Sequence, residues 1–188
     1  MKAYGLIMGL GNNRQVYKAP PPATAKDNSL NMDEVSRLWE ELGARHLSVI
    51  NLETYLSSTK DQELIQLIKR ALNEVVMPQL EQLETVLKEE GFTVPSRPVR
   101  RMNQGPPGQV NKITLSDDEV IGVLTTAGQI AIAHHVRGYG AAIKDDIKKL
   151  FKNFTSTEIE EYQKLIQLAT KRHTLENPPV VTSRRGYK

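Results

Sequence analysis

Residues 31–56 have the sequence NMDEVSRLWEELGARHLSVINLETYL, and this stretch predicts a long amphipathic helix. Asn31 is a good N-cap, and Glu34 follows three residues later, which is the pattern of a capping box. The apolar positions are spaced by threes and fours, with one gap of seven, and they are Val35, Leu38, Leu42, Val49, Leu52 and Leu56. A helix with such a stripe buries it against other helices.

A second helix is predicted after the polar turn at residues 57–61. Its apolar positions also recur every three or four residues, and Gly91 is placed to end it at the C′ position. Pro78 falls inside this helix and should kink it, because proline lacks a backbone donor and clashes with the preceding turn.

Two further helices are predicted in the second half of the chain. The third begins with the capping box Ser116 to Glu119, and the fourth begins near Asp145, whose acid group suits the positive end of a helix dipole. Thr155 with Glu158 offers another capping box, at which the fourth helix could break and restart.

The two helix pairs are separated by residues 91–115, which contain four prolines and three glycines and therefore predict a linker. Two helical hairpins joined by a long linker predict an all-α, four-helix bundle with a long crossover between helices 2 and 3, which is ferritin-like connectivity. We expect an extended N-terminal arm at 1–30, the bundle at 31–177 with its basic crossover at 91–115, and a basic C-terminal tail at 178–188.

Charge is distributed unevenly between these parts. The predicted helices at 31–90 and 116–170 carry 20 acidic and 12 basic residues, a net charge of −8. The remaining residues carry 13 basic and 2 acidic residues, a net charge of +11. An acidic body with basic arms suits a protein whose arms lie on other copies of itself.

Several classes of protein are disfavoured by composition. The chain has no cysteine, which excludes disulfides and thiol chemistry. No apolar run reaches the roughly 18 residues that a membrane span needs. The apolar start of the chain is interrupted by Gly5, Gly9 and Gly11, without a nearby small-residue cleavage site. We therefore predict cytoplasmic synthesis without a strong export signal, which leaves assembly on the spore or the cell surface open.

Four stretches carry a resemblance to a known family. They are Leu38-Trp39-Glu40, Glu90-Gly91-Phe92-Thr93-Val94-Pro95, Glu160-Glu161-Tyr162 and Asn177-Pro178-Pro179. Together they resemble a family of ferritin-like bundle proteins from spore-forming relatives of Bacillus, akin to the spore coat protein F group. The resemblance covers roughly residues 31–180 and implies the fold, but it implies little about activity.

Ferritin-like bundles often hold two metal ions between Glu residues and Glu-x-x-His pairs on facing helices. This sequence contains no Glu-x-x-His. We therefore predict no metal site, no cofactor and no catalytic residue, and we expect at most one of His134 and His135 to face the core. A residual metal near His46, Glu53, Glu158 or Glu161 stays open.

The sequence predicts a structural protein, not an enzyme, that oligomerises or polymerises with itself through its arms. The alternative is a metal-binding ferritin-like enzyme or storage protein. Nucleic-acid binding is disfavoured, because the body is acidic and aromatic residues make up only 5% of the chain. The predicted assembly residues are Tyr4, Leu6, Ile7, Met8, Leu10, Arg97, Arg100, Arg101, Arg184 and Arg185.

Overall fold

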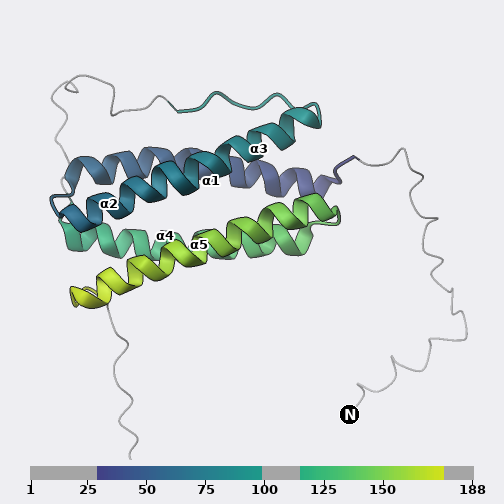
Figure 1. The fold of residues 1–188 in the computed structure, drawn as a ribbon. Coiled ribbons are helices and arrows are strands. Elements are labelled where there is room, and N and C mark those ends of the chain that lie inside the picture. The colour runs from purple at the N-terminus through teal and green to yellow at the C-terminus, as the bar shows by residue number, and fades with distance from the viewer. Residues whose placement is uncertain (1–28, 99–114, 176–188) are drawn as a thin grey trace, which may run out of the picture.

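The computed structural model describes residues 29–98 and 115–175, and this part of the chain is helical without any strand (Figure 1). The helical segments are α1 (Met32–Ser58), α2 (Gln62–Arg70), the π-helical segment η1 (Ala71–Val76), α3 (Met77–Glu89), α4 (Asp117–Ala141) and α5 (Asp145–Lys171). Because α2, η1 and α3 form one continuous helix, the described chain has four long helices. The predicted all-α, four-helix bundle is confirmed in the described residues.

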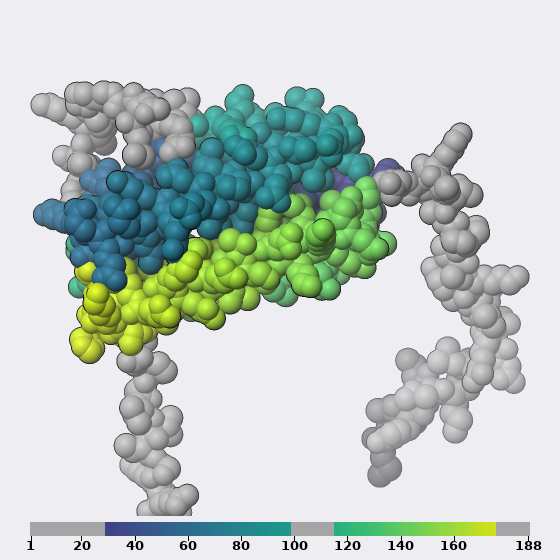
Figure 2. Space-filling view, in the orientation of Figure 1, coloured from purple at the N-terminus to yellow at the C-terminus, as the bar shows by residue number. Residues whose placement is uncertain are grey.

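Each of the four long helices packs mainly against two of the others (Figure 1). α1 packs against α3 and α4, α4 packs against α5, and α5 contacts α2 and η1. Figure 2 shows α5 lying along α2 and α3 on the visible face of the bundle. α3 and α4 run in the same direction, so α4 begins at the opposite end of the bundle from the end of α3.

Local capping signals set the helix starts. Both predicted capping boxes are present, one at Asn31 with Glu34 and one at Ser116 with Glu119. Each satisfies backbone N–H groups that the first helical turn would otherwise leave unpaired. α5 begins at Asp145 as predicted but continues without a break, because Thr155 donates its hydroxyl hydrogen to the carbonyl of Phe151 within the helix.

Pro78 is accommodated by a change of helix type. η1 ends with a hydrogen bond from the amide of Met77 to the carbonyl of Leu72, five residues back. Pro78 then lies in the first turn of α3, where its missing donor is tolerated. A π-helical segment of this kind relieves the clash that proline would cause in an unbroken α-helix.

The end of α3 turns the chain back along the bundle. Gly91 adopts a φ of +88°, and Phe92 donates its amide hydrogen to the carbonyl of Leu87 at 2.9 Å. This is the glycine-ended motif expected at a helix C-terminus. Residues 92–98 then lie outside the bundle beside α3, where Arg97 pairs with Glu84.

The apolar core consists of two separate clusters, one toward each end of the bundle. One contains Val49, Leu52, Leu64, Ile68, Leu72, Val76, Val120, Ile121, Leu165, Leu168 and Ala169. The other contains Leu38, Leu42, Leu80, Leu83, Leu87, Ala142, Ile147, Leu150, Phe151 and Phe154. None of the described helices combines the length and the apolar character needed to cross a membrane.

Candidate functional site

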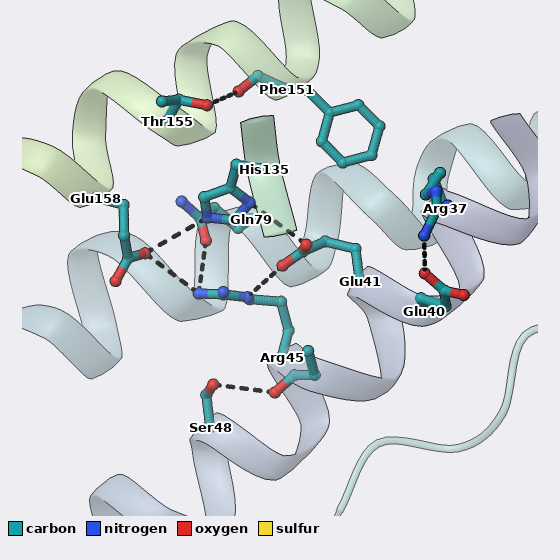
Figure 3. A network of polar contacts seen from close by, with 11 residues as sticks. Arg37, Glu40, Glu41, Arg45, Ser48, Gln79, His135, Phe151, Thr155 and Glu158 are labelled. Carbon is teal, nitrogen blue, oxygen red and sulfur yellow. Dashed lines mark hydrogen bonds and ion pairs between the residues drawn. The ribbon is translucent and has the colours of Figure 1, made fainter. Parts of the chain in front are cut away.

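A layer of charged and polar side chains lies between the two apolar clusters (Figure 3). It draws side chains from all four long helices, and we call Glu41, Arg45, Gln79, His135 and Glu158 the charged layer. Four of these residues are at most 4% exposed, and only the Glu158 side chain, at 16%, reaches the surface. Charged residues are seldom buried this deeply unless they pair with one another.

The Arg45 guanidinium is the centre of the layer (Figure 3). Its Nε donates to Glu41 Oε1 at 2.9 Å, and its Nη1 donates to Gln79 Oε1 at 3.1 Å. The same Nη1 lies 3.4 Å from Glu158 Oε2. Arg45 therefore links α1 to α3 and to α5 through a charge that cannot be removed at ordinary pH.

His135 brings α4 into the layer. Its Nδ1 lies 3.4 Å from Glu41 Oε2, and its Nε2 lies 3.6 Å from Glu158 Oε2. Its ring also packs edge-on against Phe154, with 5.5 Å between the ring centroids. Burial by itself would lower the pKa of His135, but the carboxylates of Glu158 and Glu41 outweigh that effect and raise the pKa.

The charges of the layer balance when His135 is protonated. Burial alone would raise the pKa of Glu41, but the neighbouring His135 and Arg45 lower it below its ordinary value. Two carboxylates then face one guanidinium and one imidazolium. Burying such groups is costly, and only this mutual pairing makes the layer compatible with a folded core.

The layer does not fit a metal ion, although it lies where facing helices of a bundle can build one. Glu41, His135 and Glu158 are suitable donor types, but the guanidinium of Arg45 stands between the two carboxylates. A divalent cation there would face a fixed positive charge at close range. Within residues 29–98 and 115–175, no group of three or more acidic, His or Cys side chains is arranged to hold a metal ion.

Comparison with known families gives a match over residues 22–186 to a family described as proteins of unknown function, DUF3231. The chain belongs to the DUF3231 family. No curated protein matches the chain.

Among solved structures, the chain is similar to a protein of Bacillus halodurans provisionally assigned as a spore coat protein. The two share 21% identity and a TM-score of 0.74, over 82% of this chain and 97% of that protein. A conserved hypothetical protein of Mycobacterium tuberculosis shares 13% identity and a TM-score of 0.57, over 74% of this chain and 99% of that one.

A third similar structure is a two-domain protein of Anabaena variabilis with a DJ-1/ThiJ/PfpI-like domain and a ferritin-like domain. It shares 19% identity and a TM-score of 0.61, over 88% of this chain and 48% of that protein. These likenesses show that this DUF3231 chain has a ferritin-like fold.

The sequence left open a residual metal site near His46, Glu53, Glu158 or Glu161. In this DUF3231 structure, these four residues are dispersed. Glu158 joins the charged layer, whereas Glu161 binds Arg70 at 2.7 Å and Lys164 at 2.6 Å. Half-buried His46 lies near Glu84 and Arg97, where burial lowers the pKa of its imidazole. Buried Glu53 lies on α1 about two turns beyond Arg45. Only Glu158 of the four therefore belongs to the layer.

Of the two adjacent histidines, His135 faces the core, in line with the expectation that at most one of the pair does so. Among the predicted assembly residues, only Arg97 is described. Its Nε and Nη2 donate to the two Glu84 carboxylate oxygens of the same chain at 2.7 and 3.0 Å. The others, Tyr4, Leu6, Ile7, Met8, Leu10, Arg100, Arg101, Arg184 and Arg185, lie outside the described residues.

Three members of the layer escaped the sequence prediction, namely Glu41, Arg45 and Gln79. The sequence did carry a signal for Arg45. The apolar stripe of α1 has a gap of seven residues between Leu42 and Val49, and Arg45, a buried charged residue, lies in that gap. Gln79 had no comparable signal, since a single Gln next to Pro78 fits an exposed helix position equally well.

Proposed function

We propose that this protein is a structural, self-assembling member of its family, a ferritin-like bundle without a working metal site that joins other copies through its arms. The observation that carries the proposal is the Arg45 guanidinium, bonded to Glu41 and facing Glu158. It supplies inside the core the positive charge that a metal would bring to these carboxylates. With that charge in place, the buried carboxylates are paired without a metal ion.

The burial of the layer also supports a structural role over a catalytic one. Glu41 and His135 are 2% and 0% exposed, so their polar atoms face one another and not a substrate. A mainly apolar cavity beside Arg45 and Glu158 has a volume of only about 120 Å³. Sites for drug-sized ligands are usually about 300–1,000 Å³.

The charge distribution supports assembly through the arms. Arg97 shows how a basic residue of the crossover can bind an acidic helix, since its guanidinium holds the Glu84 carboxylate with two hydrogen bonds. We propose that the arginines at 100, 101, 184 and 185 bind the acidic helices of neighbouring subunits in the same way. Apolar residues 4–10 would dock extended into a groove of a neighbour.

Such a contact joins an arm to a different surface of the next subunit. It is heterologous, so it closes into a ring or continues as a filament. Four aliphatic side chains at about 1.5–3 kcal/mol each would offset much of the cost of ordering the arm. The spore is the proposed place of assembly, supported by the likeness to the Bacillus halodurans protein and by the resemblance to the spore coat protein F group.

Deletion of residues 1–18 tests the assembly. The full chain should form particles or filaments in light scattering and electron microscopy, while the truncated chain should remain a folded helical monomer or small oligomer. Circular dichroism of the truncated chain controls for folding. Identical assembly by both chains would overturn the proposed role of the arm.

Metal analysis of the purified full chain separates the structural role from a metal-binding ferritin-like enzyme or store. We expect less than stoichiometric iron, manganese and zinc after incubation with each metal and desalting. Stoichiometric binding that disappears in Glu158→Ala would overturn the proposal, since Glu158 is the layer's most accessible carboxylate.

A further inference from the structure

The outer side of α4 differs from the outer sides of the other long helices. α4 packs against α1 and α5, and its remaining side faces away from the bundle. No Asp, Glu, Lys or Arg occurs from position 120 to position 136, whereas α5 carries ten such residues among its 27. A solvated helix face is normally charged or polar, so this face is unusual for one exposed to water.

A straight line of exposed residues runs along this side, and we call it the outer stripe. Its members are Glu119, Val123, Thr126, Ile130, Ala133 and Arg137. Ile130 and Val123 are 55% and 41% exposed. The stripe stays on one face because its members are three or four residues apart. Its ends, Glu119 and Arg137, are eighteen residues apart, which is five turns or about 27 Å.

The stripe is complementary to itself when reversed. Position 128 is the midpoint of Glu119 and Arg137, of Val123 and Ala133, and of Thr126 and Ile130. A second α4 laid antiparallel over that midpoint therefore brings each acidic end to a basic end and each apolar residue to a small or apolar one. The Glu119 carboxylate stays ionised, because hydrogen bonds from the Ser116 backbone and hydroxyl lower its pKa.

We infer that two copies of this chain pair through the outer stripe of α4, antiparallel and about a two-fold axis that passes between Thr126 and Ile130, level with position 128 along the helix. The contact is isologous, so the same residues are used twice and two Glu119–Arg137 pairs form at its edges. Small residues at 126 and 133 allow the close approach of about 8–10 Å that packed helices need. The inference does not rest on the proposed function, since it uses α4 and not the arms.

Cysteine cross-linking tests the antiparallel register directly, because the chain has no cysteine of its own. Val123→Cys chains mixed with Ala133→Cys chains should form a mixed disulfide in high yield under mild oxidation. Either variant alone should give little dimer. Efficient cross-linking of Val123→Cys with itself would indicate parallel helices, and absence of the mixed disulfide would indicate no such pairing; both results overturn the inference.

A matched pair of surface variants tests the energetics. Ile130→Glu places a charge in the centre of the stripe and should raise the dimer dissociation constant at least about tenfold in sedimentation analysis. Leu47→Glu is the control, because Leu47 is a similarly exposed aliphatic residue, at 61%, on α1. Equal loss of dimer in both variants, or in neither, would contradict the inference.

The chain's own arm is the competing occupant of this face. In chains lacking residues 1–18, the mixed disulfide between positions 123 and 133 should form in unchanged yield. If the mixed disulfide forms only after the deletion, the arm and not a second α4 covers this face of the full chain. If the deletion abolishes it, the pairing depends on the arm; both results overturn the inference. Failure of the arm proposal leaves the cross-link intact, so the two proposals fail separately.

Discussion

Arg45 joins three helices through one side chain that is almost completely buried. Its removal leaves the Glu41 carboxylate without its hydrogen-bonded cation in a medium that solvates charge poorly. Removing one partner lowers the free energy of unfolding by more than the intact pair contributes to it, because the remaining buried charge is then desolvated without compensation.

Arg45→Met should therefore lower the free energy of unfolding by about 3–5 kcal/mol, although Met fits the space and restores an apolar position. Arg37→Met is the control, since its pair with Glu40 is exposed and such pairs contribute less than about 1 kcal/mol. Denaturant unfolding followed by circular dichroism measures both. A loss for Arg45→Met no larger than the control's would show that the layer contributes little.

His135 should make stability depend on pH. Burial opposes protonation most strongly and Arg45 opposes it further, but Glu158 and Glu41 outweigh both and raise the pKa of His135 in the folded protein. A raised pKa stabilises the fold fully below the unfolded value of about 6.5, and this contribution disappears as pH rises through the folded pKa. The difference in unfolding free energy between wild type and His135→Leu should accordingly shrink as pH rises above about 6.5. A difference that grows over this range, or an NMR titration of His135 with a pKa below 6.5, would contradict this sign.

At the scale of elements, the Phe151 ring of α5 lies directly against the backbone of α4 at Gly138. A Cβ at this position would lie 2.3–2.5 Å from ring atoms of Phe151, which is itself fully buried. The glycine is therefore required by packing and not by backbone conformation. Gly140, two residues later, has open space around the same position.

Gly138→Ala should destabilise the protein by about 1–3 kcal/mol, because Phe151 must shift within a packed core. Gly140→Ala should have the opposite effect and stabilise it by up to about 1 kcal/mol, because alanine is the better helix former. Thermal unfolding of the two variants side by side measures the contrast. Equal shifts in Tm would show that α4 and α5 can separate at Gly138 without cost.

The elements themselves were largely predictable because their signals are local. Asn31 with Glu34, Ser116 with Glu119, and Gly91 mark helix ends through contacts within five residues. Thr155 with Glu158 carries the same pattern, but the Thr155 hydroxyl donates to the Phe151 carbonyl within α5 and caps no new helix. The π-helical segment before Pro78 could not be predicted, since a proline inside a helix indicates that the α-helical hydrogen bonding is interrupted but not whether a kink or a π-helical segment results.

The charged layer was less predictable than the helices. A charged residue within the apolar pattern of a helix can be buried, or it can be exposed if the buried face is rotated slightly. The sequence pattern does not distinguish the two. Only the assembled bundle shows that Glu41, Gln79 and Glu158 converge on one guanidinium. Partners in such a layer are separated by up to 113 residues, so no local spacing reports them.

At the scale of the whole molecule, charge is arranged in opposite ways inside and outside. Inside, the layer pairs acidic with basic groups and divides the core into two apolar clusters. Over the whole sequence, the helical blocks carry a net charge of −8 and the arms and linker a net charge of +11. Within the described residues, Arg97, Lys171 and Arg172 of the basic set already pair with acidic side chains of the same chain. An assembly in which arms lie on neighbouring bodies would neutralise both net charges.

Salt should therefore weaken the arm-mediated assembly. The screening length falls from about 10 Å at 0.1 M salt to about 3 Å at 1 M, so arginine contacts with acidic helices lose most of their long-range attraction. Light scattering should show average particle mass falling as salt rises over this range, with the apolar contact of residues 4–10 preserving part of the assembly at moderate salt. In the variant with glutamine at 100, 101, 184 and 185, particles should be smaller at low salt and less sensitive to added salt. Particle masses of the full chain that stay constant from low to high salt would show that the basic residues do not contribute to assembly.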